Sequence, residues 1–233
     1  MNFKADIGII GALEGEVAGI ISRLEKRNSE VFGSVEIHTG TLFGKKVAVT
    51  RCGVGKVFAA IAAEAMILYC SPSLLVNTGV GGALAGGLKT CDVVFADKLV
   101  QHDMDTSPLG DPKGLISGIN RVYFESDTRA IEILKRAAEK EKVNYLVGTV
   151  ATGDKFVASK DDKNKIVSDF SAVACEMEGG AIAHTAYVNS TPFVVVRAIS
   201  DSADGEATMD YPTFLPLATR TSEKLTLALI EEY

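Results

Sequence analysis

The stretch from Val173 to Asp204 reads VACEMEGGAIAHTAYVNSTPFVVVRAISDSAD, and it organises the interpretation of the whole sequence. Two acids, Glu176 and Glu178, precede a run of small residues that is typical of a packed helix. Pro192 ends that run, because proline lacks the backbone N–H that a helix interior uses. Phe193 to Val196 then form a continuous apolar strand of the kind that is buried on both faces.

Charged residues follow directly at the carboxyl end of this strand, namely Arg197 and Asp201. A charge at the end of a buried strand is costly unless it is paired or has a function. In open α/β sheets, ligands bind at the carboxyl ends of the strands. The sequence therefore predicts that Glu178, Arg197 and Asp201 share one site. The alternative is that Arg197 and Asp201 form an ion pair that is only structural.

Length and composition limit the class of protein. A chain of 233 residues without a linker or a repeat predicts a single domain over residues 1–233. The net charge of −6 and the lack of a basic stripe argue against nucleic acid as a partner. The apolar runs are too short for a membrane span, and the amino terminus is typical of a first strand rather than of a signal peptide.

The four cysteines show no CxxC spacing, and the three histidines are scattered. This pattern predicts reduced, buried thiols in a cytosolic protein and no metal site. His184 lies among small residues, where a packed side chain is expected rather than a catalytic one.

Strands and helices alternate along the chain, which predicts a parallel or mixed sheet covered by helices. Expected strands are 6–12, 35–41, 46–51, 74–76, 91–96, 145–152 and 193–196. Expected helices are 13–26, 57–69, one that ends near residue 142, 159–170, the run ending near residue 189, and a last helix from Tyr211-Pro212. Ser126 or Asp127 is expected to cap the third of these helices, and the helix 159–170 is also expected to be capped. The irregular segment Gln101–Asn120 has the length of a functional loop.

The turn between the first strand and the first helix resembles a glycine-rich dinucleotide turn but lacks the GxGxxG spacing. Glu14 and Glu16 stand at the start of the helix, where free N–H groups attract anions. Their carboxylates already fill that role, so a phosphate would meet like charge. The alternative is that they are ordinary acids in the first turn of a helix.

Five motifs in order carry a family resemblance. They are GIIGALEGEV from Gly8, CGVGKV from Cys52, NTGVGG from Asn77, TGDKFV from Thr152, and EMEGGAIAH with FVVVRAISDSAD. Together they make the chain similar to the 5′-methylthioadenosine/S-adenosylhomocysteine nucleosidases of the nucleoside phosphorylase superfamily. The resemblance implies an α/β, three-layer phosphorylase-like fold, whose mixed and partly barrel-like central sheet is flanked by helices.

The resemblance also implies an activity. The expected reaction is hydrolysis of the N-glycosidic bond of 5′-methylthioadenosine, S-adenosylhomocysteine and 5′-deoxyadenosine, which releases adenine without a cofactor. The expected setting is the cytoplasm, in methionine salvage and in the recycling of S-adenosylmethionine by-products. The expected partners are a nucleoside, water and a second copy of the chain in a homodimer.

By the same resemblance, Asp201 protonates N7 of the base, Glu16 activates the water, Glu178 binds the ribose hydroxyls, and Arg197 helps to fix water and ribose. The other expected contacts are Gly82 and Met177 at the ribose, Phe156 and the Val157 backbone at the adenine, Leu13, Val54 and Tyr211 around the 5′-substituent, and Met104 and Leu109 from the second copy.

The chain departs from the family pattern at Val80, where the family often has a hydroxyl residue, and in the loop from His102 to Ile119. Three alternatives stay open: a nucleoside phosphorylase of the same fold, a futalosine hydrolase, and a nucleoside-binding sensor without catalysis. A phosphorylase needs arginines around a phosphate, and Arg51 and Arg197 are the candidates that the sequence offers. A sensor would tolerate loss of Glu16 or Asp201, and both acids are present.

Overall fold

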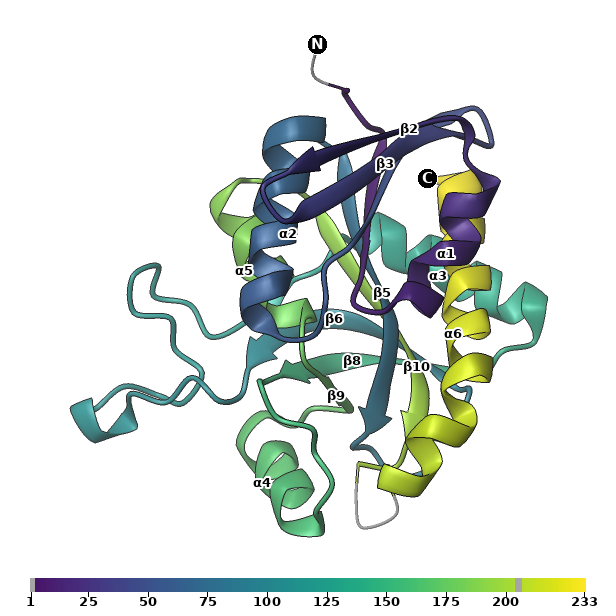
Figure 1. Cartoon of the computed structure of the whole chain (residues 1–233). Coiled ribbons are helices and arrows are strands. Elements are labelled where there is room, and N and C mark those ends of the chain that lie inside the picture. The colour runs from purple at the N-terminus through teal and green to yellow at the C-terminus, as the bar shows by residue number, and fades with distance from the viewer. Residues whose placement is uncertain (1–2, 204–206) are drawn as a thin grey trace.

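Ten strands of one mixed sheet form the centre of the molecule, and helices cover both of its sides (Figure 1). The computed structural model describes residues 3–203 and 207–233. Its strands are β1 (Ile7–Gly11), β2 (Glu25–Phe32), β3 (Val35–Leu42), β4 (Lys45–Arg51), β5 (Leu74–Ala83), β6 (Val93–Gln101), β7 (Phe124–Glu125), β8 (Tyr145–Thr152), β9 (Ala174–Glu176) and β10 (Phe193–Asp201). Its helices are α1 (Glu14–Arg23), α2 (Lys56–Cys70), the short 3₁₀ helix η1 (Ser107–Leu109), α3 (Thr128–Glu141), α4 (Lys160–Phe170), α5 (Gly179–Val188) and α6 (Ala207–Glu232).

Part of the sheet closes on itself. The strand order β10-β6-β8-β9-β5 becomes a ring because β10 also pairs with β5 in parallel. The remaining strands, β1, β4, β3 and β2, continue from β5 as an open extension. Parallel and antiparallel pairs occur together, for example β1 with β4 and β10 with β6. The predicted mixed, partly barrel-like sheet is therefore confirmed.

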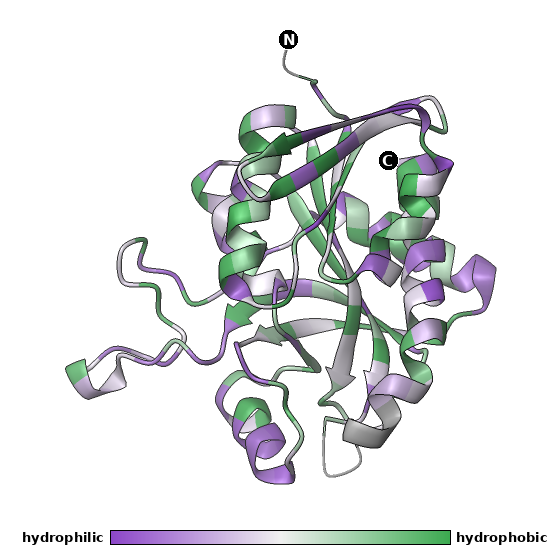
Figure 2. Ribbon diagram, viewed as in Figure 1, coloured by the Kyte–Doolittle hydropathy of each residue, from purple (hydrophilic) through white to green (hydrophobic). Residues whose placement is uncertain are grey.

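The helices form two layers around this sheet. In Figure 1, α2 and α5 lie together on one side, and α1, α3 and α6 lie on the other. Figure 2 shows many hydrophilic residues on α3 and α4, whereas the central strands β1 and β10 are buried along their whole length and mostly apolar. Apolar clusters fill the space between the sheet and each layer, which confirms the predicted three-layer arrangement. Within the described residues, no helix combines the length and the apolar character that crossing a membrane requires.

Several local predictions are confirmed. The strand Tyr145–Thr152 has the predicted bounds. Asp127 caps α3, since its carboxylate accepts a hydrogen bond from the Ala130 N–H at 2.7 Å. Ser159 caps α4 in the same way. The four cysteines are free, but only Cys70 and Cys175 are buried, because the other two lie at element ends near the surface.

The predicted helix 13–26 is wrong at its carboxyl end. Helix α1 stops at Arg23, and Glu25–Phe32 forms the strand β2 instead. This edge strand is exposed along almost its whole length, so its sequence carries no alternation of apolar and polar residues. Its charged residues suit an unpaired edge, which they protect against pairing with other chains.

Two buried strands are longer than predicted. Strand β5 continues from Val76 through the glycines to Ala83, so NTGVGG lies within a strand rather than in a turn after it. Strand β10 continues to Asp201, which places Arg197 inside the ring and not at its end. Local propensity missed both extensions, because glycine and charge are depleted in ordinary strands.

Other boundaries also differ. Strand β6 runs over Val93–Gln101 rather than 91–96, and the short strands β7 and β9 were not predicted. Helix α6 begins at Ala207 and contains Pro212 and Pro216, whereas proline was expected to open it. The buried residues Ala218, Leu225 and Leu229 anchor this helix, so packing outweighs the backbone bonds that proline removes.

The ring of strands can close only with a glycine at position 81, because a larger residue would clash with β9. A Cβ atom there would lie 2.8 Å from the backbone oxygen of Cys175, which cannot move without disturbing β9. We expect Gly81→Ala to lower the free energy of unfolding by about 1–3 kcal/mol through overpacking. The control is Gly86→Ala, where a Cβ meets no atom within 4 Å, and its effect should stay within about 0.5 kcal/mol in urea denaturation. Equal effects of the two changes would contradict the role of Gly81.

Candidate active site

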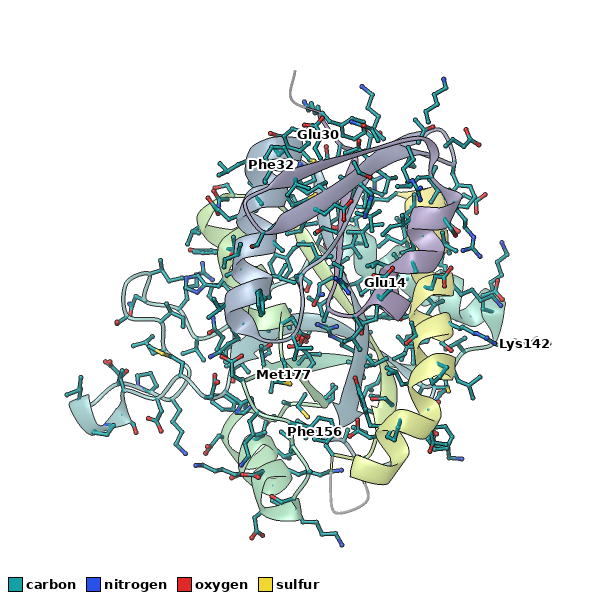
Figure 3. All side chains as sticks on the ribbon, viewed as in Figure 1. Glu14, Glu30, Phe32, Lys142, Phe156 and Met177 are labelled. Atoms are coloured by element: carbon teal, nitrogen blue, oxygen red, sulfur yellow. The ribbon has the colours of Figure 1, made fainter. Side chains whose placement is uncertain are left out.

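A pocket opens where the ring of strands meets the start of α1 and the end of β10. The residues that line it are Ala12, Leu13, Glu16, Val54, Val80, Gly81, Gly82, Lys155, Phe156, Val157, Cys175, Glu176, Met177, Glu178, Ser200, Asp201 and Tyr211. Ten of the thirteen predicted site residues are among them. Figure 3 labels two, Met177 and Phe156, which lie in the middle of the molecule just above α4.

Glu16 is a buried acid held by backbone N–H groups. One carboxylate oxygen accepts hydrogen bonds from Ala12 and Leu13 at 2.7 and 2.9 Å, and the other accepts one from Val80 at 3.0 Å. Burial raises the pKa of Glu16 above its usual value, although Arg197 and these N–H groups act in the opposite direction. The carboxylate therefore occupies the anion site that the start of α1 creates.

Glu176 and Glu178 lie at the junction of β9 and α5, and both are buried. Glu176 accepts hydrogen bonds from the N–H groups of Glu178 and Gly179 at 2.9 and 2.6 Å, and it also pairs with Arg197. Glu178 accepts one hydrogen bond from the Gly55 N–H at 2.9 Å. Burial raises the pKa of Glu178 to about 7, although Arg197 opposes this rise and Glu176 adds to it.

Arg197 lies behind the pocket and is completely buried. Its guanidinium donates hydrogen bonds to Glu176 and Asn77, and it lies 3.6 Å from Glu178. Burial would lower the pKa of Arg197, but the surrounding glutamates outweigh it and raise the pKa further. Its Nε and Nη1 atoms have no hydrogen-bond partner among the described residues. Arg197 thus pairs with these acids from the interior side of the pocket, and two of its donor atoms stay without a partner among the described residues.

Asp201 closes the other side of the pocket at the end of β10. Its carboxylate accepts hydrogen bonds from the Ser200 hydroxyl and from the Ala203 N–H, each at 2.9 Å. It stands opposite Gly82 in the parallel pairing of β10 with β5. A Cβ at Gly82 would approach the Asp201 carboxylate to 2.9 Å, so glycine at this position leaves the acid accessible from the pocket.

Apolar and aromatic side chains complete the walls. Phe156 is 41% exposed and meets the Tyr211 ring edge-on, with ring centroids 5.6 Å apart. Such a partly open ring offers a flat apolar face to a ligand. The thiol of Cys175 also lines the pocket, and burial together with Asp201 raises its pKa to about 12, so it stays protonated.

Three predicted site residues lie outside this pocket. Arg197 sits beneath it, because β10 carries that side chain into the interior of the ring. Met104 and Leu109 lie on the irregular segment Gln101–Asn120, which projects away from the body of the molecule in Figure 1. Leu109 is 83% exposed there.

The prediction omitted several lining residues, above all Glu176, whose carboxylate organises Arg197 and the start of α5. Its sequence signal was the pair of acids before a small-residue helix, but spacing alone does not tell which acid faces a ligand. The alternative, a structural ion pair of Arg197 with Asp201, differs from the ion pairs found here, which join Arg197 to Glu176 and Glu178.

The pocket offers acid–base chemistry on a small, flat, partly apolar ligand. Acids reach it from α1, from the β9–α5 junction and from β10, and backbone or guanidinium donors hold each of the glutamates. Carboxylates with shifted pKa values in one pocket are typical of catalytic sites. Among the described residues, no group of three or more His, Cys, Asp or Glu is arranged to hold a metal ion.

Known proteins that are similar to this chain identify its family. The family model described as the phosphorylase superfamily matches residues 6–231. The 5′-methylthioadenosine/S-adenosylhomocysteine nucleosidase of Haemophilus influenzae (strain PittGG) is 38% identical over 226 residues, which are 97% of this chain and 98% of that protein.

Solved structures give the same result. The nucleosidase of that name from Neisseria meningitidis, in complex with methylthio-immucillin-A, is similar with a TM-score of 0.94 and 34% identity, over 97% of this chain and 99% of the other. Futalosine hydrolase of Helicobacter pylori strain 26695 is similar with a TM-score of 0.93 and 33% identity, over 97% of each chain.

The raised pKa of Glu178 predicts a pH-dependent stability. A carboxyl whose pKa is higher in the folded than in the unfolded state binds protons on folding, so it stabilises the protein at low pH and loses this effect as the pH rises past about 7. When the pH rises from 5 to 8, the free energy of unfolding should fall less for Glu178→Gln than for the parent. The difference between the two decreases should be on the order of 1–3 kcal/mol.

Urea denaturation at the two pH values measures this difference. Glu25→Gln, a change at an exposed position of β2, is the control and should follow the parent. Parallel pH dependence of the parent and Glu178→Gln would show that Glu178 does not take up a proton on folding.

Proposed function

Because the chain belongs to the phosphorylase superfamily, and within it to the 5′-methylthioadenosine/S-adenosylhomocysteine nucleosidases, which hydrolyse N-glycosidic bonds, we propose that it releases adenine from these two nucleosides by hydrolysis. The observation that carries this proposal is that Glu16, Glu178 and Asp201 line one shared pocket together with Phe156. A nucleoside needs one acid at the base, one at the ribose and one at the attacking water.

Asp201 is proposed to act at the leaving base. Adenine departs more easily when N7 carries a proton, because the electrons of the broken bond then remain on a neutral base. Phe156 stacks on the adenine, Met177 and Gly82 contact the ribose, and the backbone of Val157 reads the edge of the base. The hydrogen bonds from Ser200 and Ala203 fix the carboxylate of Asp201 for this role.

Glu16 is proposed to take the proton of the attacking water. The oxygen of that water forms the new bond to C1′, and its proton passes to the carboxylate. The raised pKa of Glu16 improves this base, since it brings the proton affinity closer to the working pH. The two unpartnered donors of Arg197 suit a bound water or a ribose hydroxyl, and Glu178 suits the ribose hydroxyls as an acceptor.

Phosphorolysis fits the same pocket poorly. The N–H groups of Ala12, Leu13 and Val80 already bind the Glu16 carboxylate, so they are not free to bind phosphate. Arg51 is largely exposed and lies 3.6 Å from Glu14, and Arg197 is engaged with Glu176. An anion would therefore meet carboxylates where a phosphorylase needs cations.

Futalosine hydrolysis is the second candidate, because the Helicobacter pylori futalosine hydrolase matches this chain nearly as well as the nucleosidases do. Leu13, Val54 and Tyr211 line the pocket as apolar residues, which favours a thioether over a charged 5′-group. 5′-Deoxyadenosine, whose 5′-methyl group is smaller still, fits the same proposal.

The setting follows from the reaction. Methylthioadenosine and S-adenosylhomocysteine are by-products of S-adenosylmethionine, so the proposed role is methionine salvage and by-product recycling. The free cysteines support a reducing compartment, the cytoplasm. One continuous sheet from β1 to β10 supports a single domain over residues 1–233.

The test is the release of adenine from 5′-methylthioadenosine, S-adenosylhomocysteine and 5′-deoxyadenosine, with futalosine and inosine as further substrates, followed by chromatography. We expect adenine and a free 5-substituted ribose at the same rate with and without phosphate. A requirement for phosphate, with ribose 1-phosphate as product, would establish the phosphorylase alternative. Faster turnover of futalosine would establish the second candidate.

Glu16→Gln is the matched variant for this assay. The amide keeps the shape but cannot accept a proton, so turnover should fall by about 10²–10⁴-fold while a transition-state-like inhibitor still binds. Binding without turnover in the parent would identify a nucleoside sensor instead.

We also propose a homodimer formed through α2 and α5. Apolar side chains on these helices are exposed, including Val57 at 70%, Leu68 at 65% and Val188 at 53%. Val57 and Val188 border a groove between the helices, to which Ile61 and Ala181 also contribute. The loop Gln101–Asn120 extends on the same side of the molecule, where its Met104 and Leu109 would reach the pocket of the second copy (Figure 1).

Val57→Asp tests this assembly. The change puts a charge into the proposed interface but suits the first turn of α2, where an acid is favourable for the helix itself. We expect a monomer by light scattering, with adenine release strongly reduced. Leu217→Asp, at a residue of α6 that is 52% exposed on the opposite side, should leave a dimer of parental activity. An active monomer would remove this proposal.

A further inference from the structure

Lys163 of α4 reaches toward the pocket, although it is not among the residues that line it. Its side-chain ammonium donates hydrogen bonds to the backbone oxygens of Ala83 at 2.8 Å and of Ser202 at 2.7 Å. Ala83 ends β5, and Ser202 directly follows β10. One half-buried cation on a surface helix thus joins the ends of the two strands that close the ring.

The peptide group between Ser202 and Ala203 connects this lysine to Asp201. Its carbonyl accepts the hydrogen bond from Lys163, and its N–H donates to the Asp201 carboxylate at 2.9 Å. Hydrogen bonds at the two ends of one peptide group polarise it and strengthen each other. The chain of contacts therefore runs from a cation, through a single peptide, to a carboxylate.

The backbone at this point needs support from outside. Ala203 has a φ of 50°, in the left-handed region that is unfavourable for residues with a Cβ atom. Such a conformation persists where the surroundings determine it, and it is often found at functional sites. The two hydrogen bonds of the 202–203 peptide hold it there, together with the burial of Ala203.

We propose that Lys163 is a positioning residue for Asp201: it fixes the 202–203 peptide, and that peptide aims the carboxylate at the leaving base. This inference rests on the proposed function, in which Asp201 delivers the proton to the base. A lysine that only ties α4 to the sheet would make the same two contacts but would affect all substrates alike. The two roles are separated by the dependence of the rate on the leaving group.

The experiment compares Lys163→Met with Lys165→Met, a control on an exposed position of the same helix. For each, kcat/KM is measured for methylthioadenosine and for an analogue whose leaving group departs without protonation. We expect Lys163→Met to lose about 10-fold or more on methylthioadenosine, a part of the 10²–10⁴-fold that general acid catalysis supplies, and to lose little on the analogue. Lys165→Met should match the parent on both.

Two further variants sharpen the result. Lys163→Arg keeps a charged donor that can bond both carbonyls, so it should restore most of the preference for methylthioadenosine. In the background of Asp201→Asn, where the acid is already lost, Lys163→Met should have almost no further effect on kcat/KM. If the methionine variant does not fold, Lys163→Gln, which keeps a neutral N–H donor, replaces it in the same comparison.

Equal losses on both substrates, with a lowered melting temperature, would overturn the proposal and leave Lys163 a structural tether. The proposal would also be overturned if the losses of kcat/KM caused by Lys163→Met and by Asp201→Asn simply multiply in the double variant. A parent protein that releases no adenine would defeat the proposed function itself. If the parent is active but Lys163→Met has the same kcat/KM values as Lys165→Met, this inference alone is defeated.

Discussion

The structure depends on one buried cation. Arg197 is completely enclosed by the ring of strands, and a charge in such a place is stable only with partners that offset its loss of water. Glu176 and Glu178 form ion pairs with it, and together with Glu16 they raise the pKa of the guanidinium. Removing Arg197 would leave these buried carboxylates without their cation, so the site and the core are stabilised together.

The closed sheet is what allows this arrangement. Strand β5 passes next to β10, and its glycines at positions 79, 81 and 82 leave the space that Arg197, the β9 backbone and Asp201 occupy. Without the β10–β5 pairing, the carboxylates from α1, the β9–α5 junction and β10 would not face one pocket. The same glycines weaken an ordinary strand, so their presence reflects the site rather than the stability of β5.

The acids of the pocket differ in how they are held. Glu16 is fixed by backbone N–H groups at the start of a helix, Glu178 by one N–H group and a nearby cation, and Asp201 by its own turn and the peptide that Lys163 contacts. Burial raises the pKa values of both Glu16 and Glu178. Different surroundings around chemically similar groups are how one pocket can assign them different tasks.

The sequence by itself determined the alternation of strands and helices, a cap at Ser126 or Asp127, a cap at the start of the helix 159–170, and the positions of Glu178, Arg197 and Asp201 beside buried strands. These follow from periodicity and from short-range chemistry, which are local. It did not reveal β2, whose exposed edge has no apolar pattern, nor the length of β5, whose glycines look like a turn. Only the tertiary structure decided that Arg197 lies beneath the pocket and that Glu176 is its partner, because these depend on strand register and ring closure between segments far apart in the chain.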